Sequence, residues 1–412
     1  MWDVGIVMPV YRQDPSYLTM ALRTVLDQSY RNFHFVIVSD GAPSETINVM
    51  KEVTNGDPRV RLIVKERNQG VASALNTGFD YLMTKEEVKF LTWVSSDNIY
   101  YPNFVEKHRE TLKKSSPNVG LSYSCFRYID AAGNYLKEIP TETLLDFQKK
   151  RKDQLLECCF IGVSFMYKKH FAKMIDGYQF PQVEDYEYWL RLSEVCDITH
   201  IEDVLMDYRY NSPLSISTQL NSSTVEKRKW RYFYNLAKKQ ARLRRKIPCK
   251  VTIIFPVDSK IGRAVKQLEN LLEQTYSNYN ILIIDYSDDP NTTKVLRQII
   301  DPRITYHIFS NLTEEMAIRE GIKLVHTPHT IVYGKRDDYS NVRTLNNLMM
   351  ELQVSQNKVT NDNSLRKSIK EMKTMKLYYT RKLKLFVRKV GRKGEKRTNF
   401  KNGINPQKRR KN

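Results

Sequence analysis

The sequence lacks the features that would place it in a membrane or outside the cell. None of its apolar runs approaches the roughly 20 residues that a membrane-spanning helix needs. The chain begins directly with a strand-like pattern instead of a basic segment followed by an apolar one, so no export signal is expected. Its five cysteines are odd in number and show no metal-binding spacing, which argues against a disulfide framework and a zinc site. We therefore expect a protein of the reduced cytoplasm that does not cross a bilayer.

Acidic residues are scarce in two segments, and this scarcity explains the net charge of +21. Residues 364–412 hold 19 Lys and Arg against 2 Asp and Glu, and residues 226–250 hold 11 against 1. The remainder has a net charge of −6, so the basic charge belongs to a linker and a tail. With 412 residues, 41% of them apolar, the chain is long enough for two folded domains.

Strand-like and helix-like patterns alternate over residues 1 to about 130. Buried strands are expected at residues 4–8, 34–38, 60–64 and 90–94, with amphipathic helices between them. This alternation predicts a mostly parallel, doubly wound sheet. Residues 119–225 look different, because two further strands are followed by a helix that starts at a Glu-Asp pair. We expect this part to form the other side of a cleft.

Four short signals stand where apolar runs of the first half stop or start. They are Pro-Val-Tyr at residues 9–11, Asp-Gly at 40–41, Ser-Ser-Asp-Asn at 95–98 and Glu-Asp at 184–185. Ligands of open α/β sheets bind just beyond the carboxyl ends of the strands. The series therefore predicts one crevice lined with carboxylates.

The opening pattern returns in the second half of the chain. Residues 251–257 echo residues 4–10, and residues 317–322 match residues 74–79. Three further segments match in the same order, at residues 272–279, 281–285 and 331–338. The alternative is chance similarity between two α/β segments, but five matches in register favour an internal duplication. The second copy has no counterpart of residues 119–225.

Taken together, the four signals resemble glycosyltransferase family 2, whose catalytic domain has the GT-A fold, over residues 3 to about 217. Residues 97–102 look most like spore-coat polysaccharide glycosyltransferases of that family. The resemblance implies an α/β GT-A fold with a mostly parallel sheet that binds a nucleotide sugar. A second, degenerate GT-A-like α/β unit and a basic helical tail would follow. The expected segments are a catalytic domain at 1–225, a basic helical linker at 226–250, a degenerate repeat at 251–345 and a basic tail at 346–412.

The resemblance implies that Asp185 is the general base that takes a proton from the acceptor hydroxyl, with Glu184 supporting the site. One base without a nucleophile fits a single displacement, which inverts the anomeric configuration. Taken alone, a carboxylate pair at a helix start is often only a cap or a partner of the helix dipole.

Asp97 is the implied ligand of a divalent metal, Mn²⁺ or Mg²⁺. Such an ion neutralises the charge of a diphosphate leaving group. Members of the family usually place two or three acidic residues here, whereas Ser95, Ser96 and Asn98 leave a single carboxylate. The alternative role of Asp97 is that of a helix N-cap.

The resemblance also implies a set of positions that bind the nucleotide sugar, namely Pro9, Val10, Tyr11, Asp40, Asn68, Gly70, Ser96 and Arg209. Tyr11 would pack against the base, Asp40 would accept the imide N–H of uracil or thymine, and Arg209 would lie near the diphosphate. From the residues alone, Tyr11 fits the rim of a core and Asp40 fits a simple turn. Arg209 equally fits a surface strand, and residues 68–70 fit a helix entry.

The expected function is thus inverting transfer of a sugar from a UDP or dTDP sugar to a hydroxyl of a glycan, cell-envelope or spore-surface acceptor. An apolar stripe through residues 365–386 of the basic tail predicts a helix that lies on the inner face of a membrane or docks on the second domain. Residues 251–345 would serve structure or protein contact. The alternatives are a catalytically inactive scaffold that binds sugar nucleotides, and a nucleic-acid-binding protein. The latter leaves the ordered carboxylates unexplained.

Overall fold

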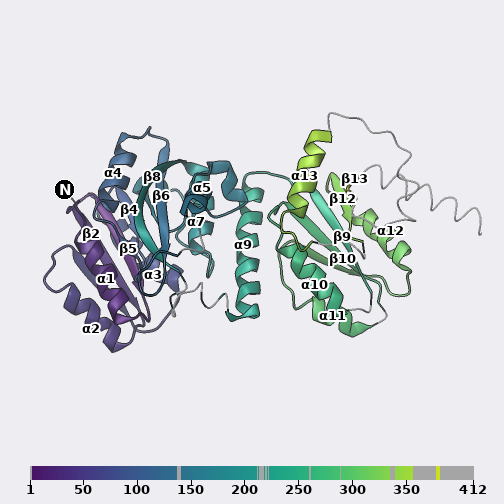
Figure 1. The fold of residues 1–412 in the computed structure, drawn as a ribbon, viewed down its shortest axis with the longest axis horizontal. Helices are drawn as coiled ribbons and strands as arrows, with labels where there is room; N and C mark the ends of the chain where they lie inside the picture. Colours follow the sequence, from purple (N-terminus) through teal and green to yellow (C-terminus); the bar gives the residue numbers. More distant parts are fainter. Residues whose placement is uncertain are drawn as a thin grey trace, which may run out of the picture. The chain divides into compact units, whose positions relative to one another are not determined.

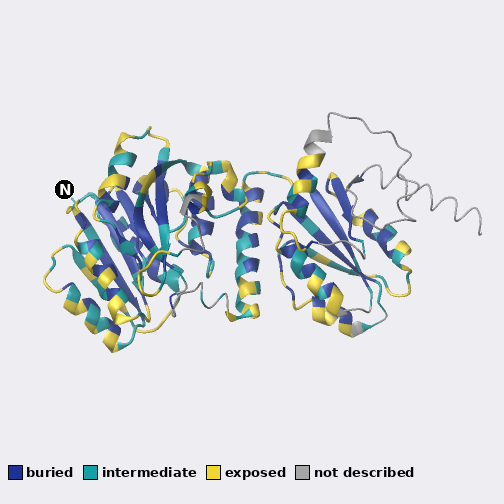
Figure 2. Ribbon diagram, in the orientation of Figure 1, coloured by how far each residue is buried: buried dark blue, intermediate teal, exposed yellow. Residues whose placement is uncertain are grey.

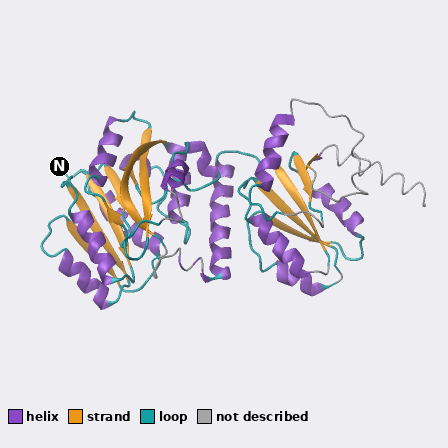
Figure 3. Cartoon of the chain, in the orientation of Figure 1, coloured by secondary structure: helices purple, strands orange, loops and turns teal. Residues whose placement is uncertain are grey.

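The chain divides into two compact units, Met1–Lys246 and Ile247–Asn412. The computed structural model describes residues 2–136, 141–210, 212, 218, 220, 222–258, 261–287, 289–334, 339–355 and 377–380. In each unit a sheet forms the middle layer and helices flank it (Figure 3). The finer division into four segments stays a prediction.

The first unit is built on an eight-stranded sheet in the order β3-β2-β1-β4-β7-β6-β8-β5. Its strands are β1 (Val4–Val10), β2 (Phe33–Asp40), β3 (Val60–Lys65), β4 (Phe90–Trp93), β5 (Ile99–Tyr100), β6 (Val119–Ile129), β7 (Phe165–Lys168) and β8 (Asp197–Arg209). Strands β1 to β4 pair in parallel, β7 is antiparallel to β4 and β6, and β6 pairs with β8 in parallel. The predicted α/β fold with a mostly parallel sheet is therefore confirmed.

Alternating side chains of β1 and β2 build two cores, one on each face of this sheet. Val7 and Val36 pack with residues of α3 and α7, whereas Ile6 and Ile37 pack with residues of α1, α2 and α4. Because both faces are covered, β1 and β2 are buried along nearly their whole length (Figure 2). The helices of this unit are α1 (Pro15–Leu26), α2 (Ser44–Val53), α3 (Val71–Met83), α4 (Phe104–Lys114), α5 (Thr141–Gln148), η1 (Lys152–Leu156), α6 (Lys169–Ala172), α7 (Glu184–Val195) and α9 (Thr224–Arg244).

The second unit carries a five-stranded sheet in the order β11-β10-β9-β12-β13 (Figure 1). Its elements are β9 (Val251–Val257), α10 (Ile261–Leu272), β10 (Tyr279–Asp285), α11 (Pro290–Leu296), β11 (Ile304–Ile308), α12 (Glu314–Leu324), β12 (His329–Val332), α13 (Thr344–Ser355) and β13 (Leu377–Tyr379). The first four strands repeat the order β3-β2-β1-β4, and they pair in parallel as those strands do. The predicted second α/β unit is therefore present.

A glycine brings one helix of each unit directly onto its sheet. Gly78 of α3 and Gly321 of α12 occupy matching positions of the two copies. A Cβ atom at Gly78 would lie 2.5 Å from Cγ1 of Val7, and one at Gly321 would clash with Cδ1 of Ile284. The close helix-to-sheet contact explains why a small residue recurs there.

The substitution Gly321→Ala is expected to lower the free energy of unfolding of the second unit by about 1–3 kcal/mol, because the added methyl group overpacks the core. Gly262→Ala in α10 is the matched control, since a Cβ there meets no atom within 4 Å and alanine favours a helix by up to about 1 kcal/mol. Thermal unfolding of the two variants measures the difference. Equal melting temperatures would contradict the close contact.

The helical periodicity predicted through Tyr379 is wrong at residues 377–379. These residues form β13, which pairs with β12 in antiparallel orientation. A strand at the edge of a sheet presents unpaired N–H and C=O groups, and pairing with them outweighs an amphipathic pattern. The other residues of the predicted stripe lie outside the described residues. None of the helices within the described ranges has the length and hydropathy that crossing a membrane requires.

Candidate functional site

Three of the four predicted signals lie at one edge of the first sheet. The parallel pairing of β1 with β2 and β4 brings the carboxyl ends of these strands together. Pro9 is half-buried and Val10 is buried at the end of β1, but Tyr11 is 41% exposed. Tyr11 is therefore not part of the core, and its ring is accessible at this edge.

Asp40 is buried at the end of β2, where its carboxylate has two backbone donors and one ion-pair partner. Oδ2 accepts hydrogen bonds from the backbone N–H groups of Gln69 (3.0 Å) and Gly70 (2.8 Å). Oδ1 lies 2.6 Å from Nζ of Lys65. Asp40 thus ties β2 to the loop that enters α3, next to the exposed Asn68. Sequence reasoning missed Lys65. This residue ends β3 directly opposite Asp40 at the end of β2, so aligning the ends of the two predicted strands could have identified it.

Asp97 lies in the loop between β4 and β5. The next helix, α4, begins only at Phe104, so the alternative of Asp97 as a helix N-cap is wrong. Oδ2 of Asp97 accepts a hydrogen bond from Oγ of Ser212 at 3.1 Å. Burial raises the pKa of Asp97, while the Ser212 bond and the charge of Arg209 oppose that increase. Ser212 was not identified from the sequence, although it lies only a few residues after the predicted Arg209.

Arg209 is buried, which excludes the alternative of a surface strand residue. Its Nε donates to the backbone carbonyl of Asp97 at 3.1 Å. Its Nη1 donates to the carbonyls of Asp130 (2.8 Å) and Ala131 (2.9 Å). The guanidinium also lies over the ring of Tyr17, 4.1 Å from the centroid. Arg209 therefore fixes the backbone of the Asp97 loop from its buried side.

The side chains beside Asp97 limit how a metal ion could bind. Oδ1 of Asn98 accepts from the backbone N–H of Arg209 at 3.0 Å, and Oγ of Ser96 accepts from Nε2 of Gln13 at 3.1 Å. Within the described residues, no three His, Cys, Asp or Glu side chains form a metal-binding group. Mg²⁺ is commonly bound through one or two carboxylates, with phosphate oxygens and water completing its shell. Asp97 fits such an ion as a single protein ligand.

Glu184 and Asp185 are the first two residues of α7. The N-cap residue, Val183, makes no side-chain capping bond, and Oδ1 of Asp185 accepts from the N–H of the next residue, Tyr186, at 2.6 Å. The pair therefore does not cap the helix in the usual way. Burial raises the pKa of both carboxyl groups, and the charge of Asp185 raises that of Glu184 further. Carboxyl groups with raised pKa values are typical of functional sites.

Asp185 lies at the same edge of the sheet as Asp97. Tyr234 connects Asp185 to Cys159: its hydroxyl accepts a hydrogen bond from the N–H of Cys159 at 3.1 Å, and its ring stacks on Tyr186, the residue after Asp185, with centroids 4.6 Å apart. Cys159 precedes β7, whose first residue, Phe165, accepts a hydrogen bond from Oγ1 of Thr92 in β4 at 2.6 Å. Because β7 is antiparallel to β4, the loop before β7 lies at the carboxyl end of β4. The Glu-Asp pair at residues 184–185 therefore lies at the same edge of the sheet as the other three signals.

Asn76 and Tyr178 link the two halves of this site, and sequence reasoning missed their link. Asn76, on α3, accepts from the N–H of Tyr178 at 2.7 Å and donates to its carbonyl at 2.9 Å. The ring of Tyr178 stacks on Tyr188 of α7, with centroids 4.1 Å apart. The helix that bears Asp185 is therefore anchored to the helix that follows the Asn68–Gly70 loop.

The basic helix α9 uses its charges within the first unit. Lys238 and Arg242 donate to backbone carbonyls at the end of η1 (2.6 and 2.9 Å), and Arg245 donates to a carbonyl of α7 at 2.8 Å. Tyr234 stacks on Tyr186 of α7, with centroids 4.6 Å apart. One aromatic ring that a nucleic-acid platform would need is thus engaged in packing.

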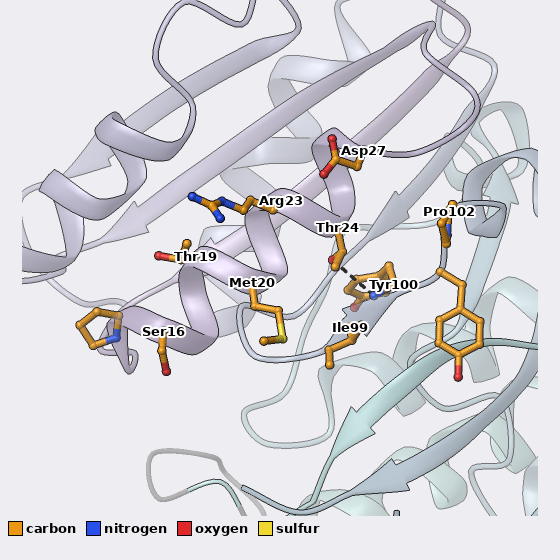
Figure 4. Close-up of a pocket in the computed structure, with 11 residues that line it drawn as sticks. Ser16, Thr19, Met20, Arg23, Thr24, Asp27, Ile99, Tyr100 and Pro102 are labelled. Atoms are coloured by element: carbon orange, nitrogen blue, oxygen red, sulfur yellow. Dashed lines mark hydrogen bonds between the residues drawn. The ribbon is translucent and has the colours of Figure 1, made fainter. Parts of the chain in front are cut away.

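A pocket of about 760 Å³ adjoins the Asp97 loop on the side of α1 (Figure 4). It lies between α1 and residues 99–102, where Oγ1 of Thr24 accepts from the N–H of Tyr100 at 3.3 Å. The hydroxyl of Tyr100 in turn accepts from the N–H of Ser95 at 2.8 Å. One wall of the pocket therefore supports the loop that carries Asp97.

Residues 5–175 match the family model described as glycosyl transferase family 2. An uncharacterised glycosyltransferase of Rickettsia conorii is 26% identical, over 78% of this chain and 58% of its own length. One of Rickettsia felis is 28% identical, over 78% of this chain and 59% of its own length. The chain thus spans less than two thirds of these curated relatives.

Two solved structures are also similar to this chain. A mannosyltransferase from Pyrobaculum calidifontis in complex with GDP-Man and Mn²⁺ aligns with a TM-score of 0.45 and 13% identity, over 57% of this chain and 64% of its own. S. aureus TarS 1–349 in complex with UDP-GlcNAc aligns with a TM-score of 0.44 and 12% identity, over 57% and 66%.

Proposed function

We propose, on the basis of the glycosyl transferase family 2 domain in residues 5–175, that this protein is an inverting glycosyltransferase that uses a nucleotide-diphosphate sugar. The observation that carries the proposal is the carboxylate of Asp185, which has a raised pKa at the same sheet edge as Asp97. A carboxylate that takes the proton of the acceptor and one that holds a metal ion against the diphosphate would meet the two needs of sugar transfer.

Asp185 acts as the general base in this proposal. The N–H of Tyr186 holds Oδ1, which orients the carboxylate and leaves Oδ2 to take the proton of the acceptor hydroxyl. The acceptor oxygen then bonds to the anomeric carbon as the bond to the diphosphate oxygen breaks, so the configuration inverts. A raised pKa strengthens a base at neutral pH, because its conjugate acid holds the proton more tightly.

The donor would lie along the ends of β1, β2 and β4. Tyr11 is accessible for stacking on the base. Asp40 accepts from two backbone N–H groups and pairs with Lys65, and it retains lone pairs for the imide N–H of a UDP or dTDP sugar. Asp97 would hold Mn²⁺ or Mg²⁺ together with diphosphate oxygens, and the bound ion would neutralise the leaving group. Arg209 serves as a positioning residue that fixes the Asp97 loop.

Three finer assignments stay proposals. The acceptor is a hydroxyl of a glycan, a cell-envelope or a spore-surface polymer, in keeping with the resemblance of residues 97–102. Residues 364–412 would contact the inner face of a membrane, and residues 251–345 would contact another protein. A catalytically inactive scaffold remains the second candidate, because one carboxylate stands where the family usually has two or three.

A thermal-shift screen of nucleotide sugars, with and without Mn²⁺, tests the proposal. We expect a UDP or dTDP sugar to raise the melting temperature, with a further increase when Mn²⁺ is added. Asp97→Ala should lose only the Mn²⁺-dependent increase, while Asp80→Ala on the exposed face of α3 should keep it. A chain that responds to oligonucleotides and to no sugar nucleotide would refute the proposal, and binding without turnover would favour the scaffold.

The pH profile of transfer should show an acid limb at a higher pH than an ordinary aspartate gives. The base must be ionised, so kcat/KM falls as the pH drops through the pKa of Asp185. Burial raises this pKa, and the limb should therefore lie above the usual value of about 3.9. Initial rates measured between pH 4 and 8 with the identified donor would locate it. A rate that stays constant down to about pH 4 would contradict the role of Asp185.

A further inference from the structure

A basic pocket of about 590 Å³ lies in the first unit, away from the candidate active site. It is formed by the segment between α3 and β4, the end of α4, and the junction of β7 with α6. Its basic lining consists of Lys89, Lys113, Lys168, Lys169, His170 and Lys173, of which the five lysines carry the positive charge, whereas Glu86 is its single acidic lining residue. The pocket therefore has a large excess of positive charge.

Backbone carbonyls hold the ammonium groups of two lysines of this pocket. Lys169 is buried, and its Nζ donates to the backbone carbonyls of Leu82 (3.2 Å) and Lys85 (2.5 Å). Nζ of Lys89 donates to the carbonyl of Glu86 at 3.2 Å. Within the described residues, no ion pair joins one of the five pocket lysines to a carboxylate. An anion in the pocket would compensate this charge.

Burial lowers the pKa of Lys168 and of Lys169. The charges of Lys173 and Lys89 lower the pKa of Lys169 further, while those of Glu87 and Glu86 oppose the decrease. Burial lowers the pKa of His170, and the charge of Lys168 lowers it further. A bound anion would favour the charged forms of these groups.

The shape and donor type of the pocket indicate the kind of anion. Val88, Phe90 and Leu112 are buried and form an apolar floor, while Lys89, Lys113 and Lys173 are exposed at its rim. Lysine ammonium groups act as point charges without the planar fork that arginine offers to carboxylates. Several such charges around one hollow suit a compact ligand of high charge, as a phosphate group is.

The pocket and the candidate active site lie at opposite ends of β4. Phe90, the first residue of β4, pairs with Lys168 at the end of β7, whereas Asp97 lies in the loop beyond Trp93, the last residue of the strand. The residues of β4 alone, at about 3.3 Å each, separate the two ends of the strand by roughly 10 Å. A ligand in the pocket would therefore not touch Asp97.

We propose that this pocket is a second anion site, which binds a phosphate group separately from the sugar-nucleotide donor. The phosphate belongs either to a soluble phosphorylated molecule or to the headgroup of an anionic lipid. In both cases the lysine ammonium groups contact the phosphate oxygens, and the apolar floor accommodates the carbon that carries the phosphate.

Binding of inorganic pyrophosphate to the full chain tests the proposal by isothermal titration calorimetry. EDTA is present, so that no metal ion supports binding at Asp97. A pocket variant carries Lys89→Gln, Lys113→Gln and Lys173→Gln, and a control variant of equal charge carries three exposed changes outside the pocket, Lys51→Gln, Lys149→Gln and Lys229→Gln. We expect the pocket variant to raise the Kd about tenfold or more and the control variant to change it less than about twofold.

Vesicles distinguish the two sources of the phosphate. The wild type and both variants are pelleted with phosphatidylglycerol vesicles and with phosphatidylcholine vesicles. Both variants keep the basic tail and the same net charge, so a difference between them reports on the pocket. Loss of pelleting with phosphatidylglycerol in the pocket variant alone would identify a lipid headgroup, and equal pelleting of the variants with weakened pyrophosphate binding would identify a soluble ligand. A wild type that does not bind pyrophosphate, or a pocket variant that binds as tightly as the control, would overturn the proposal.

Discussion

Asp185→Asn is expected to lower kcat by about 10²–10⁴-fold while the Kd for the nucleotide sugar stays unchanged. Asparagine has nearly the same shape as aspartate, and its oxygen still accepts from the N–H of Tyr186. It cannot take a proton from the acceptor, however, so the chemical step loses its base. Turnover of the identified donor measures the first effect, and a thermal shift with that donor measures the second.

Two further variants test whether the loss of activity in Asp185→Asn comes from the loss of the general base. Asp176→Asn changes an exposed carboxylate on the approach to α7 and should keep full activity. Glu184→Gln should retain more activity than Asp185→Asn, because Glu184 supports the site without taking the proton. Full activity in Asp185→Asn would remove the assigned role, and equal losses in the Asp176 and Asp185 variants would indicate a disturbed helix instead.

The sequence correctly predicts the positions of those residues that lie at strand ends, while their roles stay predictions. Asp40 and Asp97 each follow an apolar run, and parallel pairing brings such positions to one edge whatever the loops between them do. The same logic applies to the second unit, whose strand order repeats that of the first. The local sequence is sufficient to predict these positions, because the hydrophobic periodicity of a segment and the end of a strand are local properties.

The contacts that fix these residues could not be predicted, because they join segments far apart in the chain. Arg209 reaches the carbonyl of Asp130 only because β8 pairs with β6, and a buried arginine has no local signature. Asn76 holds Tyr178 across 102 residues of sequence. In both cases tertiary packing selects the partner, and composition and periodicity carry no information about it.

Asp40→Ala is expected to lower the free energy of unfolding of the first unit by about 3–5 kcal/mol, the usual effect of removing one partner of a buried ion pair. The change leaves the ammonium of Lys65 without its carboxylate and the N–H groups of Gln69 and Gly70 without an acceptor. Urea unfolding of the first unit measures the loss. Asp27→Ala is the control, since Asp27 is an exposed carboxylate at the end of α1 and should change stability by less than about 0.5 kcal/mol.

Asp40→Asn separates the structural role of this residue from a role in donor binding. Asparagine retains one oxygen for the loop N–H groups, so its loss of stability should be smaller than that of Asp40→Ala. If Asp40 also accepts the imide N–H of the base, an amide N–H at this position would oppose that group and weaken binding of a uracil or thymine nucleotide by about 1–3 kcal/mol. If Lys65→Met and Asp40→Asn lose donor affinity to the same extent, in proportion to their loss of stability, Asp40 serves only to hold the loop. Affinity lost in Asp40→Asn but kept in Lys65→Met would place the base against Asp40.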